Sequence, residues 1–481
     1  GLIRSQSNYF LSKYQRVLET KNGYRNGGYI GPPGLAQLRL KLTDPGNMSF
    51  GLVAQKDPGE QYLQPEIPVP DFFAGHFYMQ DLGPIKQLAV GDYKLQFGQG
   101  LILGSGFLTG KNSQVIRAVK QSTLGVLPYS SVTEYDFFRG AATNVSIGKH
   151  LNVTAFISTR NLDATLHQDS LDSYVTSIRK TGLHRTPSEL NGKNAMHEIV
   201  AGGQIGYSGK HFNVGVLTAN TFYQHPLQPK STRYNQAHFR GQVLNNFSVY
   251  ADLNLQNVTL FTELAKSIQG GVGGVAGTII GLGPKVDFSL LARHYDKNFY
   301  SMYGRSFSEQ SSSRNESGVY WGLELRPARQ VALSMYFDFY KLPWLSSRLL
   351  APTSGKEIFL RANVQLSPSS KMYFQVKRDV QEQQKSGAIL PDGVQVVLWK
   401  SIFNIDYNLD TPFELRTRVQ YNLSGFEDNS SSVLLYQDIR FSVRKWELNS
   451  RFILFDDPSN LTRQYTYERD MLFSFNTQSF A

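Results

Sequence analysis

A strict alternation of apolar and polar side chains, in segments of about ten residues, is the feature that most constrains the fold of this chain. Residues 412–423 read PFELRTRVQYNL, and residues 331–344 and 357–366 follow the same pattern. Successive side chains of a β-strand point to opposite faces, so each segment has one apolar face and one polar face. The polar faces carry charges in the middle of the segment.

Two all-β architectures use this alternation. A soluble sandwich packs the apolar faces together and leaves the polar faces in water. A transmembrane barrel turns the apolar faces to lipid and the polar faces to the lumen. Tight turns alternate with longer polar connections along this chain, as they do between the two rims of outer-membrane barrels. The tight turns are expected at 146–152, 207–213, 326–330, 367–371 and 408–412. The longer connections are expected at 56–71, 163–196, 224–237, 301–316, 345–356, 382–396 and 424–432.

We therefore predict one all-β domain over residues 1–481, a large antiparallel transmembrane β-barrel of roughly 20–24 strands. A soluble all-β protein is the remaining alternative. The 481 residues include no cysteine, which excludes disulfides and Cys-based metal sites or nucleophiles. No run of about 18 apolar residues occurs, which excludes a helical membrane protein. The chain opens at Gly1 without a basic start or an apolar core, so it reads as a mature or trimmed product.

Residues 92–111, DYKLQFGQGLILGSGFLTGK, show a second alternation. Four glycines share the even positions, and they are Gly98, Gly100, Gly104 and Gly106. Apolar and aromatic residues share the odd positions, and they are Tyr93, Leu95, Phe97, Leu101, Leu103 and Phe107. We predict a wall strand whose odd face meets lipid and whose bare even face lines the lumen, where a glycine track lets another backbone approach closely.

Residues 108–136 follow this strand and alternate poorly. We predict that they fold inward, as a plug or constriction packed against the glycine track. The alternative is that the glycines only permit strong local curvature of the sheet.

Charged residues on the polar faces are a further group of candidates. They are Glu324, Arg326, Asp338, Arg361, Lys377, Glu414, Arg416, Arg418, Arg440 and Arg451. Rings of such charges can set ion preference in a pore. We favour the other interpretation, a self-neutralised ladder of cross-strand pairs that stiffens the lumen, because both signs occur.

No residues point to catalysis, a cofactor or a metal. The loop at 163–196 and its flanks hold His167, His184 and His197, but their spacing matches no zinc signature. We expect this to be a long external loop that contacts a partner or closes the mouth. His294 and Asp296 form a lone pair without a nucleophile motif. We therefore expect neither an enzyme nor a resident cofactor or metal.

Several segments resemble one family of outer-membrane proteins of Bacteroidota. These segments are AVGDYKLQFGQGLILGSGF (89–107), GVLPYSSVTEYDFFRGAA (125–142), NYFLSKYQRVLE (8–19), VAQKDPGE (53–60) and TGLHRTPSE (181–189). Members are usually identified by an N-terminal helix-hairpin-helix region before a predicted barrel. This chain begins at the first strand without that leader, so we expect no nucleic-acid contact. The resemblance implies a barrel in the outer membrane and supplies no catalytic residues.

Two functions are consistent with these features. The first is a structural or accessory subunit of a multiprotein outer-membrane assembly, for protein export or outer-membrane protein insertion, with an occluded lumen. The second is a channel or gated transporter for small polar or anionic solutes. The formal charge of +11 suits anionic partners such as lipopolysaccharide, or it is simply solvated. Expected partners are outer-membrane lipid or lipopolysaccharide and other outer-membrane or periplasmic proteins.

Overall fold

The computed structural model describes most of the chain. The described residues are 2–9, 19–20, 23–24, 29–32, 34–44, 47–61, 70–105, 110–169, 172–347, 349–385, 393–408, 412–426, 428–444, 446–457, 462–467 and 477–480. Among them, no helix is long and apolar enough to cross a membrane.

A single 24-stranded sheet dominates the structure. Its strands are β1 (Leu2–Tyr9), β4 (Gly34–Asp44), β5 (Met48–Lys56), β6 (Phe72–Leu82), β7 (Ile85–Gln96), β8 (Gly125–Pro128), β9 (Phe138–Ile147), β10 (Leu151–Leu162), β11 (Ala164–Gln168), β12 (Ser173–Ile178), β13 (Met196–Ser208), β14 (Phe212–Leu227), β15 (Gly241–Leu255), β16 (Val258–Ser267), β17 (Val272–Gly281), β18 (Val286–Tyr295), β19 (Glu316–Ala328), β20 (Val331–Leu342), β21 (Thr353–Gln365), β22 (Lys371–Gln384), β23 (Gly393–Asn408), β24 (Phe413–Phe426), β25 (Asp428–Val443) and β26 (Trp446–Asp456). The other elements are β2 (Glu19–Thr20), β3 (Gly23–Tyr24), β27 (Gln464–Tyr467), β28 (Thr477–Phe480), the 3₁₀ turn η1 (Arg117–Val119) and the short helix α1 (Pro187–Leu190).

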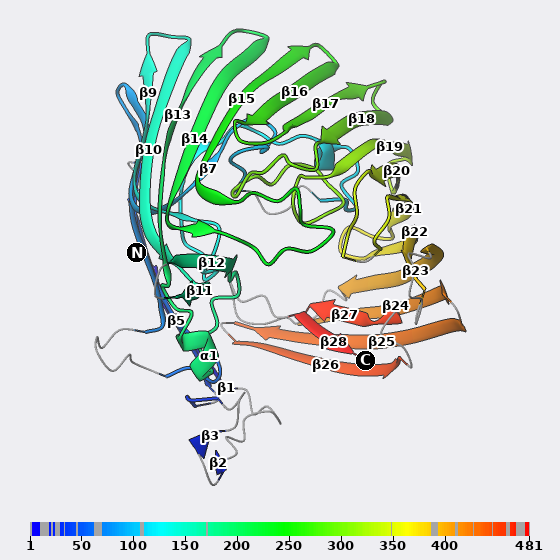
Figure 1. Ribbon diagram of the computed structural model, residues 1–481. Helices are drawn as coiled ribbons and strands as arrows, with labels where there is room; N and C mark the ends of the chain where they lie inside the picture. The colour runs from blue at the N-terminus through cyan, green and yellow to red at the C-terminus, as the bar shows by residue number, and fades with distance from the viewer. Residues whose placement is uncertain are drawn as a thin grey trace.

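The wall strands form an antiparallel meander. Each pairs with the next wall strand along the chain, from β1 and β4 through β7 and β9, β10 and β13, to β25 and β26. β11 and β12 form a hairpin inside the connection between β10 and β13. Figure 1 shows the sheet curving round a set of irregular segments that lie within the curve. The predicted all-β barrel architecture is confirmed.

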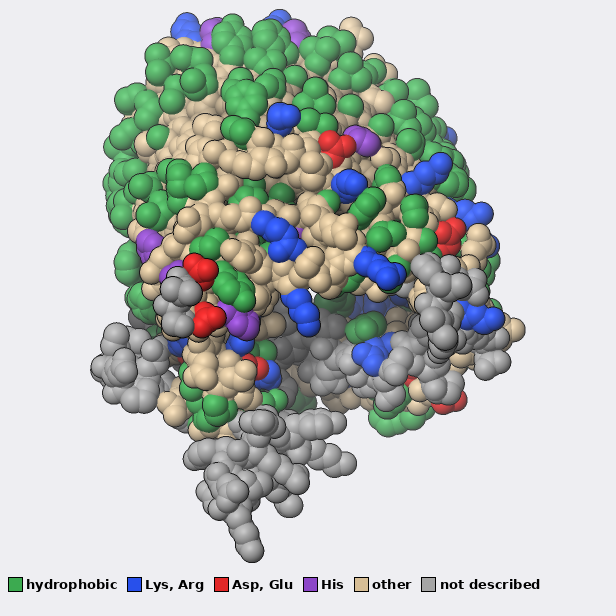
Figure 2. Space-filling view, in the orientation of Figure 1, with side chains coloured by type: hydrophobic (Ala, Val, Ile, Leu, Met, Phe, Trp, Pro, Cys, Tyr) green, Lys and Arg blue, Asp and Glu red, His purple; other side chains and the backbone are tan. Residues whose placement is uncertain are grey.

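The alternating segments have their apolar faces outside. In β24, Phe413 and Tyr421 are 43% and 42% exposed, whereas Gln420 and Asn422 are 8% and 5% exposed. Apolar side chains are exposed along most wall strands, and Figure 2 shows them covering the upper flanks of the molecule. Monomeric soluble proteins rarely expose a contiguous apolar surface of this extent. The arrangement is that of a transmembrane barrel, and it excludes the packed sandwich.

Short turns gather at one rim and long connections at the other. β9–β10, β13–β14, β19–β20, β21–β22 and β23–β24 are joined at the predicted tight turns. The long connection predicted at 424–432 is wrong, because β24 ends at Phe426 and β25 begins at Asp428. Ser424 and Ser432 stay buried on the inner face, so the alternation continues through the region that the polar composition suggested was a loop.

The wall strand predicted within 92–111 is wrong in two respects over the described residues. β7 ends at Gln96, and the glycines at 98 and 100 have φ values of 56° and 75°, which a strand does not adopt. The described odd-numbered residues of this stretch do not meet lipid. Tyr93, Leu95, Phe97, Leu101 and Leu103 are each no more than 1% exposed and belong to the largest apolar core cluster. An apolar face can point inward here because irregular segments fill the interior beside it.

The exposed apolar surface makes a test of the membrane-spanning arrangement possible. Leu360, in the middle of β21, is 43% exposed, and Leu190 in α1 is 39% exposed. We expect Leu360→Arg to lower the free energy of unfolding in lipid vesicles by about 2–4 kcal/mol, because arginine enters hydrocarbon there. Leu190→Arg, outside the wall, is the matched control and should change little. Equal effects of the two substitutions would contradict the membrane-spanning arrangement.

Candidate functional site

Two irregular stretches meet inside the curve of the sheet. Leu103 forms a bridge to Tyr303, and Arg305 N–H donates to the Gly100 carbonyl at 2.7 Å. The residues from 97 onward thus pack on the connection between β18 and β19. The described part of the predicted plug begins at residue 110. Its Val115 carbonyl accepts hydrogen bonds from Tyr320 Oη at 2.9 Å and Ser289 Oγ at 3.2 Å, both of them wall residues.

Lys111 is anchored in a group of buried carboxylates. Its Nζ lies 2.9 Å from Asp338 Oδ2 in β20 and 3.3 Å from Glu357 Oε2 in β21, and it also contacts Glu309. Asp338 and Glu357 are almost completely buried. Hydrogen-bonded charge pairs of this kind are costly to break, because either partner alone is left as a buried charge. The segment after residue 110 is therefore fixed to the wall by charge.

The same network extends along the inner face of the wall. Arg293 donates from Nη1 to Asp338 Oδ1 at 2.7 Å and from Nε to Glu316 Oε1 at 2.6 Å. Lys377 lies 2.7 Å from Glu357. Two predicted lumen charges, Asp338 and Lys377, thus belong to one buried network that holds Lys111.

A second buried group ties the connection between β18 and β19 to the opposite part of the wall. Arg160 in β10 donates to Tyr303 Oη at 3.1 Å and pairs with Glu198 in β13 at 3.4 Å. Tyr303 Oη also donates to Glu198. The internal segments therefore have charged anchors on both sides of the barrel.

Glu263 explains why glycine is needed at two of the four positions, 98 and 100. This fully buried carboxylate of β16 accepts from the backbone N–H of Gln99 at 2.6 Å and of Leu101 at 3.1 Å. The positive φ values at positions 98 and 100 form the turn that aims these N–H groups at it. A Cβ at Gly100 would lie 2.6 Å from the Gln121 side chain, within the predicted plug.

Gly104 also lies in a crowded place, since a Cβ there would be 3.0 Å from Arg305 Cβ. Gly106 lies outside the described residues.

Most other predicted lumen charges pair across neighbouring strands. Arg326 pairs with Glu324 and Asp287, Arg416 with Asp406, Arg440 with Glu414 and Glu447, and Arg451 with Asp438. Arg361 and Arg418 differ, because their described partners are neutral oxygens and aromatic rings. Cross-strand pairing is the ladder arrangement, with these two arginines outside it.

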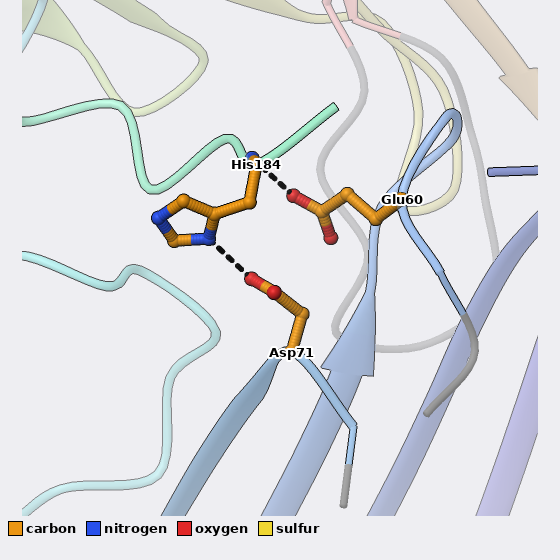
Figure 3. Close-up of side chains that lie close together, drawn as sticks. All are labelled: Glu60, Asp71 and His184. Atoms are coloured by element: carbon orange, nitrogen blue, oxygen red, sulfur yellow. Dashed lines mark hydrogen bonds and ion pairs between the residues drawn. The ribbon is translucent and has the colours of Figure 1, made fainter. Parts of the chain in front are cut away.

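The long connections form a third cluster, at their own rim. His184 donates from Nδ1 to Asp71 at 2.5 Å and from Nε2 to Asp163 at 2.8 Å, and its backbone N–H donates to Glu60 at 2.8 Å. Figure 3 shows the residues at 60, 71 and 184 converging from three separate segments. Burial alone would lower the pKa of His184, but the hydrogen bonds to Asp163 and Asp71 raise it to about 10.

The same cluster fits an ion pair better than a metal centre. Glu60, Asp71 and His184 offer ligand atoms within 4.8 Å of one another. Both imidazole nitrogens already donate to carboxylates, however, and Lys193 lies 2.5 Å from Asp71. A divalent cation would have to displace these positive groups.

The remaining loop residues do not join this cluster. His167 stacks on Tyr174, and His197 shares a hydrogen bond with Thr159. The loop predicted at 163–196 folds into the β11–β12 hairpin and α1, whose Thr186 and Glu189 form a capping box. Outside the loop, His294 pairs with Asp296 at an exposed position.

Sequence reasoning missed the residues that hold the interior together. Lys111 sits in a poorly alternating segment, and the partners of Arg160, Arg293 and Glu263 lie far away along the chain. Arg160, Arg293 and Glu263 lie at inward-facing positions of alternating strands, and this is the one signal that the sequence carries. Nothing local in the sequence pairs them with an internal segment.

No family model and no curated protein matches the chain. Among solved structures, the FrpB iron transporter from Neisseria meningitidis is similar at 10% identity and a TM-score of 0.41, over 85% of this chain and 72% of that chain. OccAB1 from Acinetobacter baumannii is similar at 10% identity and a TM-score of 0.35, over 87% of this chain and 95% of that chain. A bacterial polysaccharide outer membrane secretin is similar at 8% identity and a TM-score of 0.31, over 64% of this chain and 91% of that chain.

The rim cluster predicts a pH dependence. The pKa of His184 is raised from 6.5 to about 10, so its contribution to stability is complete below pH 6.5 and is lost as the pH rises through 10. Burial, with the charge of Asp71 nearby, raises the pKa of Glu134 from 4.5 to about 9. The contribution of Glu134 to stability is therefore complete below pH 4.5 and is lost as the pH rises through 9. We expect proteolysis within 180–190 to accelerate between pH 7 and pH 10.5, relative to the loop at 228–240.

Two variants separate the groups. His184→Gln should remove the acceleration of proteolysis that arises from deprotonation of the imidazole above pH 6.5. Glu134→Gln should leave that acceleration in place. An identical pH profile for the wild type and His184→Gln would show that the imidazolium does not hold the rim together.

Proposed function

We propose that this chain is an outer-membrane β-barrel with an occluded lumen that serves as a structural or accessory subunit of a multiprotein outer-membrane assembly, such as protein export or outer-membrane protein insertion machinery. The observation that carries the proposal is the anchoring of Lys111 on Asp338 and Glu357. It fixes the start of the 110–136 segment, acting as a plug, against the inner face of the wall, while residues 125–128 of that segment (β8) pair with the end of β7 in the sheet. The exposed apolar face supports the location, because only lipid or a partner protein covers such a surface stably.

The charged anchors lie in the half of the barrel nearest the long connections. Asp338 is near the end of β20, Glu357 near the start of β21, and Arg293 near the end of β18, all on that side. By the usual orientation of outer-membrane barrels this is the external side. A barrel closed there by paired, buried charges is suited to a scaffold better than to free diffusion.

The rim itself supports a role in assembly. Its connections are folded into the β11–β12 hairpin and α1, and His184 links them to the connections at 57–61 and 70–71. A loop held by buried ion pairs presents a fixed surface, as a docking partner requires. The proposed role is not enzymatic, because Lys111, Arg160 and Arg293 are engaged in ion pairs and Glu263 holds a backbone turn.

A channel or gated transporter for small polar or anionic solutes is the second candidate. The observation in its favour is a basic cavity on the inner face near the short turns, lined by Arg361 and Arg418 among others. Under this alternative the internal segment would move to open the lumen.

Lys111→Gln tests whether the internal segment closes the lumen. Loss of the ammonium leaves Asp338 and Glu357 short of one counter-charge, which we expect to cost about 3–5 kcal/mol. In planar bilayers the wild type should be silent, and the variant should show transient conductance steps. Lys120→Gln is the matched control, since Lys120 lies in the same segment but is more exposed and pairs with Asp252 alone. Steady wild-type conductance would refute the occluded barrel.

Copurification tests the assembly role. The tagged barrel, extracted from its native membrane in mild detergent, should co-elute with a reproducible set of outer-membrane or periplasmic proteins identified by mass spectrometry. Destabilising the rim with His184→Gln should reduce their yield, while Arg440→Gln, in the β24–β26 ion pairs away from the rim cluster, should not. A barrel that elutes alone in every detergent tested would exclude the assembly role.

A further inference from the structure

A cavity of about 1030 Å³ opens on the inner face beside the short turns. It is formed by the ends of β19 to β24 and by the turns before β18 and between β19 and β20. Seven of its lining residues are cationic, namely Lys285, Arg326, Arg329, Arg361, Lys371, Arg416 and Arg418. One lining residue, Asp406, is a carboxylate.

The single carboxylate does not balance these charges. Arg416 Nε lies 2.5 Å from Asp406 Oδ1 and so occupies it, while Arg326 is neutralised by Asp287 and Glu324. Within the described part of the chain, the other cations of the cavity have no carboxylate within 4.0 Å. The remaining positive charge faces solvent in a concave wall, where the field of like charges adds up.

Arg361 and Arg418 are held in place without being neutralised. Arg361 donates to Asn363 Oδ1 at 2.8 Å and to Gln375 Oε1 at 3.3 Å, and its guanidinium carbon lies 3.6 Å from the centre of the Tyr373 ring. Arg418 donates to the hydroxyl of the same tyrosine at 2.6 Å.

The second arginine is oriented by an amide as well. Arg418 Nε donates to Asn404 Oδ1 at 3.1 Å. Amide and hydroxyl oxygens orient a guanidinium but leave its full charge. Neither Arg361 Nη2 nor Arg418 Nη1 has an acceptor among the described residues, so each arginine keeps donors for a ligand. A wall that only needed stiffening would pair these arginines with carboxylates, as it does at Arg440 and Arg451.

We propose that this cavity is a binding site for a phosphate-bearing ligand, with Arg361 and Arg418 as its two oriented donors and Lys371, Arg329 and Lys285 as surrounding positive charges. Guanidinium groups present paired N–H donors that match tetrahedral oxyanions, and a doubly charged group gains most from several cations. The cavity is larger than one phosphate, so the ligand carries a second anionic group or an organic portion. The site opens toward the short-turn rim and requires no passage through the barrel.

Pyrophosphate is the probe for this site. In detergent at fixed chloride concentration, isothermal titration should show saturable binding of pyrophosphate and weaker binding of inorganic phosphate. The double variant Arg361→Gln/Arg418→Gln should weaken pyrophosphate binding at least tenfold. Arg440→Gln, a paired arginine that does not line the cavity, is the matched control and should leave binding unchanged. Heat-modifiable migration on gels verifies that each variant is folded.

The source of the phosphate is found by repeating the titration in nanodiscs. Competition by added phosphatidic acid would assign the site to a lipid headgroup, and its absence would assign the site to a soluble phosphorylated solute. No binding of either probe by the wild type would overturn the proposal, and so would an equal loss in Arg440→Gln. The titration is independent of the conductance of the barrel, so this proposal and the occluded-barrel proposal fail separately.

Discussion

The need to satisfy every backbone polar group in lipid is the constraint on which the rest of this structure depends. A sheet that faces hydrocarbon has no water to pair its N–H and C=O groups, so its strands pair in sequence from one hairpin to the next. That pairing fixes the alternation of faces, because an apolar residue on one side places its neighbours on the other. The polar lumen is thus a consequence of the membrane, and charged residues there need partners from neighbouring strands or from the interior.

The interior departs from a simple polar lumen where internal segments fill it. Beside residues 97–105 and 110–136, the inner face is aromatic and apolar, with Tyr93, Tyr295 and Tyr320 fully buried. Some buried charges in the same region are paired by an internal residue, as Asp338 is by Lys111. Apolar packing and ion pairs therefore act together. The packing buries apolar surface, and the ion pairs fix the position of the internal segments against the wall.

The sequence predicted the wall well and the interior poorly. The alternation at 412–423 correctly predicted which side chains face outward and which face the lumen, because apolar and polar residues alternate there. For the stretch at 92–111 the sequence predicted the wrong orientation, because alternation shows that two faces differ but not which one meets lipid once the lumen is packed. The positive φ at Gly98 and Gly100 ends the strand, and only the distant Glu263 explains it. The cluster at His184 joins residues more than 100 positions apart, which no spacing reveals.

Arginine and lysine residues of the lumen have two kinds of partner, carboxylates and neutral groups. Toward the long connections, Lys111, Arg160 and Arg293 each pair with buried carboxylates. Toward the short turns, Arg361 and Arg418 are oriented by neutral groups and keep their charge. A fold that only had to resist unfolding would gain from pairing both ends alike, since unpaired like charges repel. An anionic ligand bound between Arg361 and Arg418 would offset that repulsion, so the proposed phosphate site lies where the wall leaves its cations unpaired.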